Sequence, residues 1–211
     1  AYALKARALL YRASKLNNPD GNTAYWANAA QAAADFITQN NKQSYPYRLY
    51  NTGNPENDYY ECFTTNPVYN NEIILARSVW NTNQVEKVFL PVGFTGSFSG
   101  NGRTNPTQNL VDAYEMSNGK RIDENGSTYD AANPYKDRDP RLAQTIFYQG
   151  MMWGRADKEE RRAIDVRYNS DADKGVDYTS AMGGTYTGYY LKKFAITENH
   201  PCVRIGRRFF A

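Results

Sequence analysis

The chain has 211 residues, a formal net charge of +3 and 41% hydrophobic residues, enough to bury a sizeable core. Its basic side chains alternate with acidic ones, as in residues 158–162, so the sequence lacks the basic stripe that nucleic-acid binding requires. No apolar run approaches the roughly 20 residues of a membrane-spanning helix, and Cys62 and Cys202 match no metal-binding or redox spacing.

The chain opens with a predicted pair of helices over residues 2–39. Apolar side chains recur at helical spacing over residues 2–16, and a run of turn-forming residues ends that helix. Asn22 or Thr23 is expected to cap a second helix over residues 24–39. In length and composition, the pair is typical of a tetratricopeptide helix hairpin.

The second helix carries a stripe of aromatic, small and branched side chains. We expect Trp26 on this stripe to lie in the core or at a helix–helix contact, because an amphipathic helix buries its apolar face. The alanines of this helix allow another helix to approach closely. The stripe consists of Trp26, Ala30, Ala33 and Ile37.

Residues 40–195 are predicted to be rich in loops, with one helix and short strands, which makes the fold class mainly α with long irregular loops. The helix is expected to begin after Asn105, with Pro106 in its first turn, and to end at Gly119. Residues 150–186 are polar and rich in glycine, and are expected to be irregular. The strand candidates are residues 47–50, 71–78, 142–149 and 187–194.

The most distinctive segment, residues 133–142, contains two prolines and alternating acids and arginines. The prolines hold the preceding residues extended, and arginine offers a planar fork to a carboxylate. We expect this segment to be a structural clamp that fixes the start of the following strand, rather than a ligand site. The clamp residues are Asp137, Arg138, Asp139 and Arg141.

Two segments carry a family resemblance. Residues 110–119 read L-V-D-A-Y-E-M-S-N-G, and residues 129–142 contain Y-D, then P-Y, then R-D-P-R-L. This order resembles the middle of the SusD/RagB family, as do Ala3 to Tyr11 and Thr187 to Lys193. The resemblance implies a non-catalytic, lipid-anchored protein on the surface of the Gram-negative outer membrane. Such a protein binds oligosaccharides or polysaccharides and covers a TonB-dependent transporter of the SusC type.

The resemblance covers about residues 3–194, the central portion of a family member. Residues 1–211 are therefore expected to be a single fragment of one SusD-like domain, comprising the helix pair 2–39, the loop-rich region 40–195 and an atypical tail 196–211. The resemblance also implies that the secretion signal and the lipid-bearing cysteine lie in a front segment missing from this chain.

Exposed aromatic side chains are the strongest binding candidates, because the chain has 18 Tyr and 3 Trp. Sugar rings present apolar C–H faces to flat side chains, while amides, carboxylates and arginines bond their hydroxyls. Trp153, with Arg155 and Asp157 nearby, lies in a predicted loop, as does Trp80 with Asn81. We expect these five residues to contact a glycan ligand.

Two other functions remain open. A helical-repeat scaffold that only binds protein is one, and a carbohydrate-active enzyme, which needs only a pair of carboxylates, is the other. Asn169 to Asp177 spaces its oxygens as a calcium loop does, but lacks the glycine and the glutamate that such a loop requires. We therefore predict neither a metal nor a cofactor.

Overall fold

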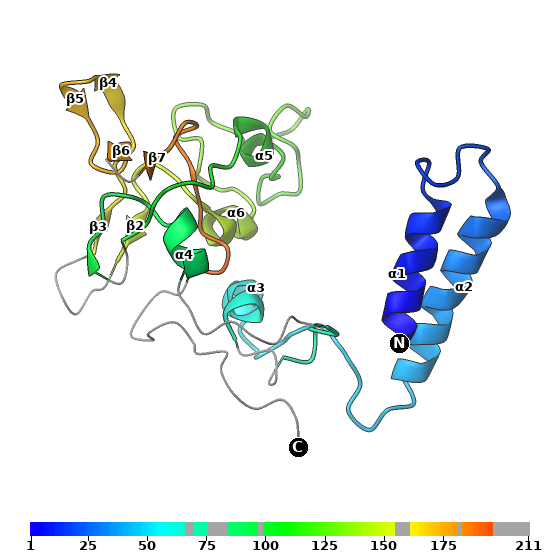
Figure 1. Cartoon of the computed structure of the whole chain (residues 1–211). Helices are drawn as coiled ribbons and strands as arrows, with labels where there is room; N and C mark the ends of the chain where they lie inside the picture. Colours follow the sequence, from blue (N-terminus) through cyan, green and yellow to red (C-terminus); the bar gives the residue numbers. More distant parts are fainter. Residues whose placement is uncertain (66–69, 76–83, 97–98, 155–160, 181–182, 196–211) are drawn as a thin grey trace. The chain divides into compact units, whose positions relative to one another are not determined.

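The computed structural model describes residues 1–65, 70–75, 84–96, 99–154, 161–180 and 183–195 (Figure 1). By its internal contacts the chain divides into two compact units. Unit 1 comprises Ala1–Tyr50 and Pro67–Arg77, and unit 2 comprises Asn51–Asn66 and Ser78–Ala211. The expectation of one domain over residues 1–211 stays a prediction.

The predicted helix pair is confirmed in unit 1, where α1 (Tyr2–Ala13) and α2 (Thr23–Asn40) run side by side (Figure 1). Asn22 caps α2, since its side-chain oxygen accepts a hydrogen bond from the backbone N–H of Ala24 at 3.0 Å. Asn18 is buried in the connection, where its side chain bonds both the N–H and the carbonyl of Asn22. The turn between the helices is thus closed by its own asparagines.

The face of α2 that packs against α1 differs from the predicted stripe. Ala29 and Ala32 are buried, whereas Trp26 is 50% exposed and Ile37 is 57% exposed. The expectation that Trp26 is a core residue is therefore wrong. Two small side chains, one turn apart, let the helix backbones approach more closely than an indole would. The face with Ala29 and Ala32 therefore packs against α1. Other exposed apolar side chains of the pair are Tyr2, Leu4, Leu10 and Tyr11.

The remainder of unit 1 is held by side-chain hydrogen bonds rather than by a strand ladder. The side-chain amide of Asn40 accepts a hydrogen bond from the N–H of Tyr47 at 2.7 Å and donates one to the carbonyl of Tyr47 at 2.9 Å. Glu72 accepts from the N–H of Tyr50 at 2.8 Å. Residues 47–50 and 71–75 form no strand, so both predicted strands are wrong over this part of the chain. Residues 76–78 lie outside the described residues.

Unit 2 begins with a helix where a loop was expected, α3 (Pro55–Thr64). Pro55 at its first position, with Glu56 and Asp58 in the first turn, is a helix-start pattern hidden by the surrounding asparagines and tyrosines. The next helix, α4 (Gln84–Phe89), is one and a half turns long. Both correct the expectation that residues 40–104 contain no helix.

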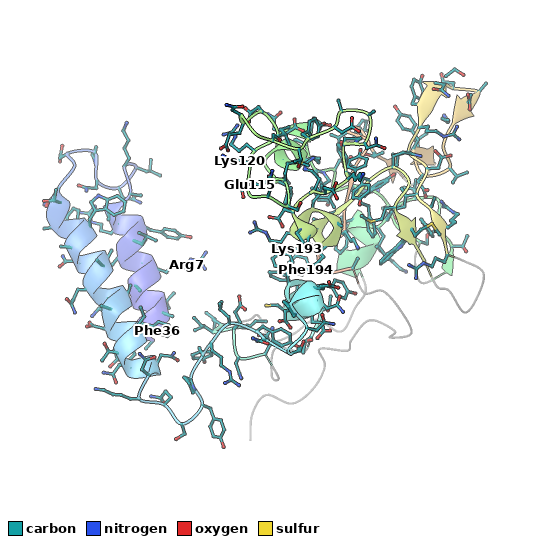
Figure 2. The ribbon with its side chains drawn as sticks, turned by 180° about the vertical axis from the view of Figure 1, so that it is seen from behind. Arg7, Phe36, Glu115, Lys120, Lys193 and Phe194 are labelled. Atoms are coloured by element: carbon teal, nitrogen blue, oxygen red, sulfur yellow. The ribbon has the colours of Figure 1, made fainter. Side chains whose placement is uncertain are left out.

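The helix α3 packs on the end of the described chain through aromatic side chains and a lysine. The Lys193 ammonium lies 3.8 Å from the Phe63 ring centroid, and Phe63 meets Phe194 edge-on at 5.6 Å. Figure 2 shows Lys193 and Phe194 next to this helix. The hydroxyl of Tyr60 donates to the Ala195 carbonyl at 3.0 Å. Cation–π contacts and a hydrogen bond therefore hold α3 in unit 2.

The predicted helix after Asn105 is confirmed in position but is short, α5 (Gln108–Asp112). Thr107 rather than Asn105 is its cap, and accepts a hydrogen bond from the Leu110 N–H at 3.3 Å. The segment predicted as a strand over residues 142–149 is instead a helix, α6 (Pro140–Thr145), followed by a strand of two residues. Pro140 at the first helical position favours the helix, because its fixed φ suits that site.

Among the described residues the strands are short and form four antiparallel pairs, which confirms a mainly α fold with few short strands. The described parts of residues 150–186 contain three of these pairs and are more regular than expected. The predicted strand 187–194 is reduced to two residues. The pairs are β1 (Ile146–Phe147) with β8 (Tyr190–Leu191), β2 (Met152–Trp153) with β3 (Arg162–Ala163), β4 (Tyr168–Ser170) with β5 (Asp173–Lys174), and β6 (Thr179–Ser180) with β7 (Gly183–Gly184).

Unit 2 has two clusters of buried apolar side chains. The smaller cluster joins α5 and α6 to the β1–β8 pair and consists of Val111, Leu142, Ile146 and Tyr189. The larger cluster lies around β1, β2 and β8 and consists of Phe89, Leu90, Phe94, Phe147, Trp153, Ile164, Val166, Tyr190 and Ala195.

A buried carboxylate organises the side of unit 2 near β3. Asp177 is 0% exposed and forms a bidentate ion pair with Arg162, whose nitrogens lie at 2.6 and 2.9 Å. It also accepts from the N–H groups of Gly93 at 3.2 Å and Asp165 at 2.8 Å. Arg162 lies over the Phe94 ring at 3.9 Å. A Cβ at Gly93 would meet Asp177 Oδ1 at 2.4 Å, so only glycine fits there.

Candidate functional site

The clamp segment is centred on Arg138, which is only 7% exposed. Its guanidinium donates to the carbonyls of Val111 at 2.7 Å, Tyr114 at 2.8 Å and Pro134 at 2.8 Å. Two of these carbonyls lie in or just after α5, whose last turn leaves carbonyls without helical partners. A cation at that end also complements the helix dipole. The partners of Arg138 are thus carbonyls and not the neighbouring aspartates.

Backbone hydrogen bonds join the clamp to the chain that follows α5. The N–H of Ser117 donates to the carbonyl of Asp137 at 2.8 Å, and the N–H of Asp139 donates to the carbonyl of Glu115 at 2.9 Å. Asp137 has a φ of 54°, a left-handed conformation that aspartate tolerates better than most residues. The turn before Arg138 therefore places it opposite the end of α5.

Asp139 and Arg141 form the second part of the clamp. The carboxylate of Asp139 caps α6 by accepting from the N–H of Arg141 at 2.8 Å, and it also binds the guanidinium, with Nε at 2.8 and 3.0 Å from the two oxygens. Hydrogen bonding from Arg141 is the main cause that lowers the pKa of Asp139 below 3.8. The same contact raises the pKa of Arg141.

A cavity of about 300 Å³ lies against this clamp. That volume is at the lower end of small-ligand pockets, which span about 300 to 1,000 Å³. One of its lining residues lies in α5, two directly follow that helix, and the other two are charged. The lining residues are Leu110, Ala113, Tyr114, Glu115 and Arg141.

The cavity combines an apolar wall with one charge of each sign. Leu110 is 46% exposed. Tyr114 is half-buried, and burial raises the pKa of its phenol, so the hydroxyl is protonated at neutral pH. Glu115, labelled in Figure 2, is exposed, as is Arg141. The site thus offers a flat ring, a carboxylate acceptor and a guanidinium donor within one hollow.

Trp153, the first of the sequence-predicted ligand residues, is in the larger core cluster and is 2% exposed. Its ring meets Phe147 at 4.6 Å with an angle of 67° between planes. The expectation that Trp153 is exposed is therefore wrong. The β2–β3 pairing sets Trp153 opposite Arg162, and this hairpin buries the indole. A side chain without exposed surface has no face for a sugar to stack on.

The other four predicted ligand residues, Trp80, Asn81, Arg155 and Asp157, lie outside the described residues, so their role stays a prediction. Within the described ranges no group of three or more His, Cys, Asp or Glu side chains is placed to hold a metal ion. In the segment that resembled a calcium loop, Asn169 donates to Asp173 at 2.9 Å across the β4–β5 hairpin. One carboxylate oxygen of this segment, on Asp173, is thus used within the hairpin.

Sequence reasoning missed the cavity residues Leu110, Tyr114 and Glu115. They belong to the L-V-D-A-Y-E run, which carried the family resemblance but was not among the predicted ligand residues. The signal that could have found them is the helical spacing of Leu110, Ala113 and Tyr114, which sets one apolar face next to a charged pair. What the sequence does not contain is the long-range contact that brings Arg141 to this face.

Comparisons with known proteins agree with this architecture. The family model of the SusD family matches residues 28–202. Among solved structures, the chain is similar to a SusD-like protein from Bacteroides fragilis, with a TM-score of 0.61 and 23% sequence identity. The match covers 94% of this chain and 36% of that one, and it concerns the fold. No curated protein matches the chain. No helix of the described residues is long and apolar enough to cross a membrane.

Proposed function

The chain belongs to the SusD family, and from this premise we propose that it is part of a protein that binds oligosaccharides at the cell surface for import. In the full-length protein a lipid anchor holds it on the outer membrane, and it delivers glycans to a TonB-dependent transporter of the SusC type. Its mechanism is reversible binding without catalysis.

The match of the SusD family over residues 28–202 is the observation that carries this proposal. The matched range contains all of the clamp and the cavity beside it. The cavity supports binding of a sugar, because its volume is in the range of small-ligand pockets and its lining pairs a flat ring with polar groups of both signs. Such a lining fits the alternation of C–H faces and hydroxyls on a pyranose.

Calorimetry of the 211-residue chain against maltohexaose, xylohexaose, mannohexaose and chitohexaose tests the proposal. We expect saturable heat with at least one of these oligosaccharides, and the recovered sugar should be unchanged in length. Shortened products would indicate an enzyme instead. If no oligosaccharide in a wider glycan array binds, the proposed ligand class is wrong.

The exposed apolar side chains of α1 and α2 favour a second candidate, a helical-repeat scaffold that binds protein. Leu4 is 63% exposed and Ile37 is 57% exposed, which is unusual for a helix pair that works alone. A scaffold predicts that Trp26→Gln with Ile37→Gln abolishes the chain's protein associations in sedimentation and pull-down experiments. It also predicts that the glycan panel gives no binding to the unchanged chain.

A further inference from the structure

We propose that the cavity lined by Leu110, Tyr114 and Arg141 is a subsite for one uncharged sugar residue, and that it discriminates against anionic sugars. This inference rests on the proposed glycan-binding function and adds both the place and the class of sugar.

The wall suits the apolar face of a pyranose. Tyr114 and Leu110 both line the cavity, together with Ala113. Ala113 carries only a methyl group and is exposed. Aromatic side chains bind flat apolar faces by dispersion and by their quadrupole.

The clamp holds this wall before any ligand arrives. Arg138 binds the carbonyl of Tyr114, and the Asp139 N–H binds the carbonyl of Glu115. The carboxylate of Asp139 holds the guanidinium of Arg141 in a fork. Three lining residues are therefore positioned by two clamp residues, which lowers the ordering cost of binding. The clamp thus positions the subsite and contributes one of its lining residues, Arg141.

The charge at the cavity is unfavourable for an anion. The positive charge of Arg141 is already compensated by Asp139, whose carboxylate contacts it directly. Glu115 lines the same cavity, and within the described part of the chain it forms no ion pair. Among the lining residues, Glu115 is therefore the charge with no bonded counter-ion in the described part of the chain. A uronic acid or a sulfated sugar would meet net repulsion, whereas hydroxyls can donate to Glu115 and accept from Arg141.

Two substitutions test the stacking wall by calorimetry with the neutral hexasaccharide that binds the unchanged chain. Tyr114→Ala should weaken binding about tenfold or more, whereas Tyr114→Phe should keep it within about threefold, because the ring is retained. Ala113→Gln, at an exposed position, should block the cavity and weaken binding about tenfold without removing any packing. Tyr186→Ala is the matched control, since Tyr186 is 97% exposed and outside the cavity.

A second pair of variants tests the charge argument with hexagalacturonate at low salt. Glu115→Gln should strengthen its binding about fivefold, because one repulsive charge is removed. Asp171→Asn, an equal change of charge at a side chain that is 90% exposed and away from the cavity, should leave it unchanged. The gain from Glu115→Gln should shrink at high salt.

The proposed function and the proposed subsite are contradicted by different results. If the unchanged chain binds no oligosaccharide, the proposed function fails. If it binds neutral hexasaccharides and both Tyr114→Ala and Ala113→Gln bind equally well, the function stands and the subsite is wrong. Tighter binding of hexagalacturonate than of every neutral sugar would overturn the assigned class.

Discussion

At the scale of single residues, Arg138 shows how a buried cation can be stabilised without a carboxylate. Its three acceptors are backbone carbonyls, and among the described residues no acid contacts it. The planar fork of arginine reaches several acceptors at once, whereas a lysine ammonium is a single point. The residue therefore closes the end of α5 and fixes the segment that carries Tyr114.

Replacement of Arg138 by lysine should lower the free energy of unfolding by about 3 kcal/mol, since buried carbonyls lose their donors and a buried charge loses its partners. Urea denaturation of the 211-residue chain measures it. Arg167→Lys is the control, because Arg167 pairs with Asp165 at an exposed position and such pairs contribute less than about 1 kcal/mol. Equal losses in the two variants would refute the role given to Arg138.

Lys192 makes stability depend on pH. Its ammonium is largely buried and donates to the Ala143 carbonyl at 2.6 Å, and burial lowers its pKa from 10.5 to about 8. The unfolded chain then holds this proton up to pH 10.5, and the folded chain releases it near pH 8. Because the folded pKa is depressed, the unfolded state binds more protons between these values. Stability should therefore rise with pH in that window.

Between pH 8 and pH 10.5, the free energy of unfolding of Lys192→Met should rise by about 2 to 3 kcal/mol less than that of the unchanged chain. The difference between the two pH profiles removes the titration of other groups. Urea denaturation at several pH values measures it. Parallel profiles would show that Lys192 is solvated in the folded state.

The residue scale also shows where sequence reasoning ends. Trp153 is followed by Gly154 and then by polar residues, which is typical of a loop, yet it is buried because β2 pairs with β3. Nothing within a few residues of Trp153 reports that pairing. The importance of Arg138 and Asp139 was visible in the sequence, but three of their partners, Val111, Tyr114 and Glu115, lie more than twenty residues upstream, in and after α5.

At the scale of elements, periodic helices were predictable and short strands were not. The helix pair in unit 1 is long enough for its apolar period to be read, and it was placed to within about three residues at each end. The strands of unit 2 have two or three residues each, too few for an alternating pattern. Within α2 the choice of buried face was missed, because both faces are apolar and only α1 decides between them.

A pair of substitutions in α2 tests that choice of face. Ala32 is 2% exposed against α1, whereas Ala33 is exposed. Ala32→Leu should overpack the contact and lower the free energy of unfolding of the helix pair by about 1 to 3 kcal/mol. Ala33→Leu should be close to neutral. Thermal unfolding followed by circular dichroism measures both, and the reverse order would place the predicted Trp26 stripe in the contact after all.

At the scale of the whole molecule, the chain is two compact units that are built differently. Unit 1 contains a helix hairpin with exposed apolar side chains. Unit 2 is irregular, and the hydrogen bonds of the clamp and the Asp177–Arg162 ion pair hold its segments together. The chain spans 36% of the SusD-like structure from Bacteroides fragilis to which it is similar. The family and the mainly α class were predictable, since they depend on local motifs and on helical periodicity. The cavity was not, because it forms only when α5 and α6 meet.

The central claim is that an oligosaccharide binds at the cavity beside the clamp. Amide chemical shifts of the isotope-labelled chain, recorded while the tightest-binding neutral hexasaccharide is titrated, test it most directly. We predict that the largest shifts fall in residues 110–116 and 138–142 and saturate together with the calorimetric heat. Saturating shifts confined to the helix pair or to the β4–β5 hairpin, with residues 110–116 unmoved, would contradict it.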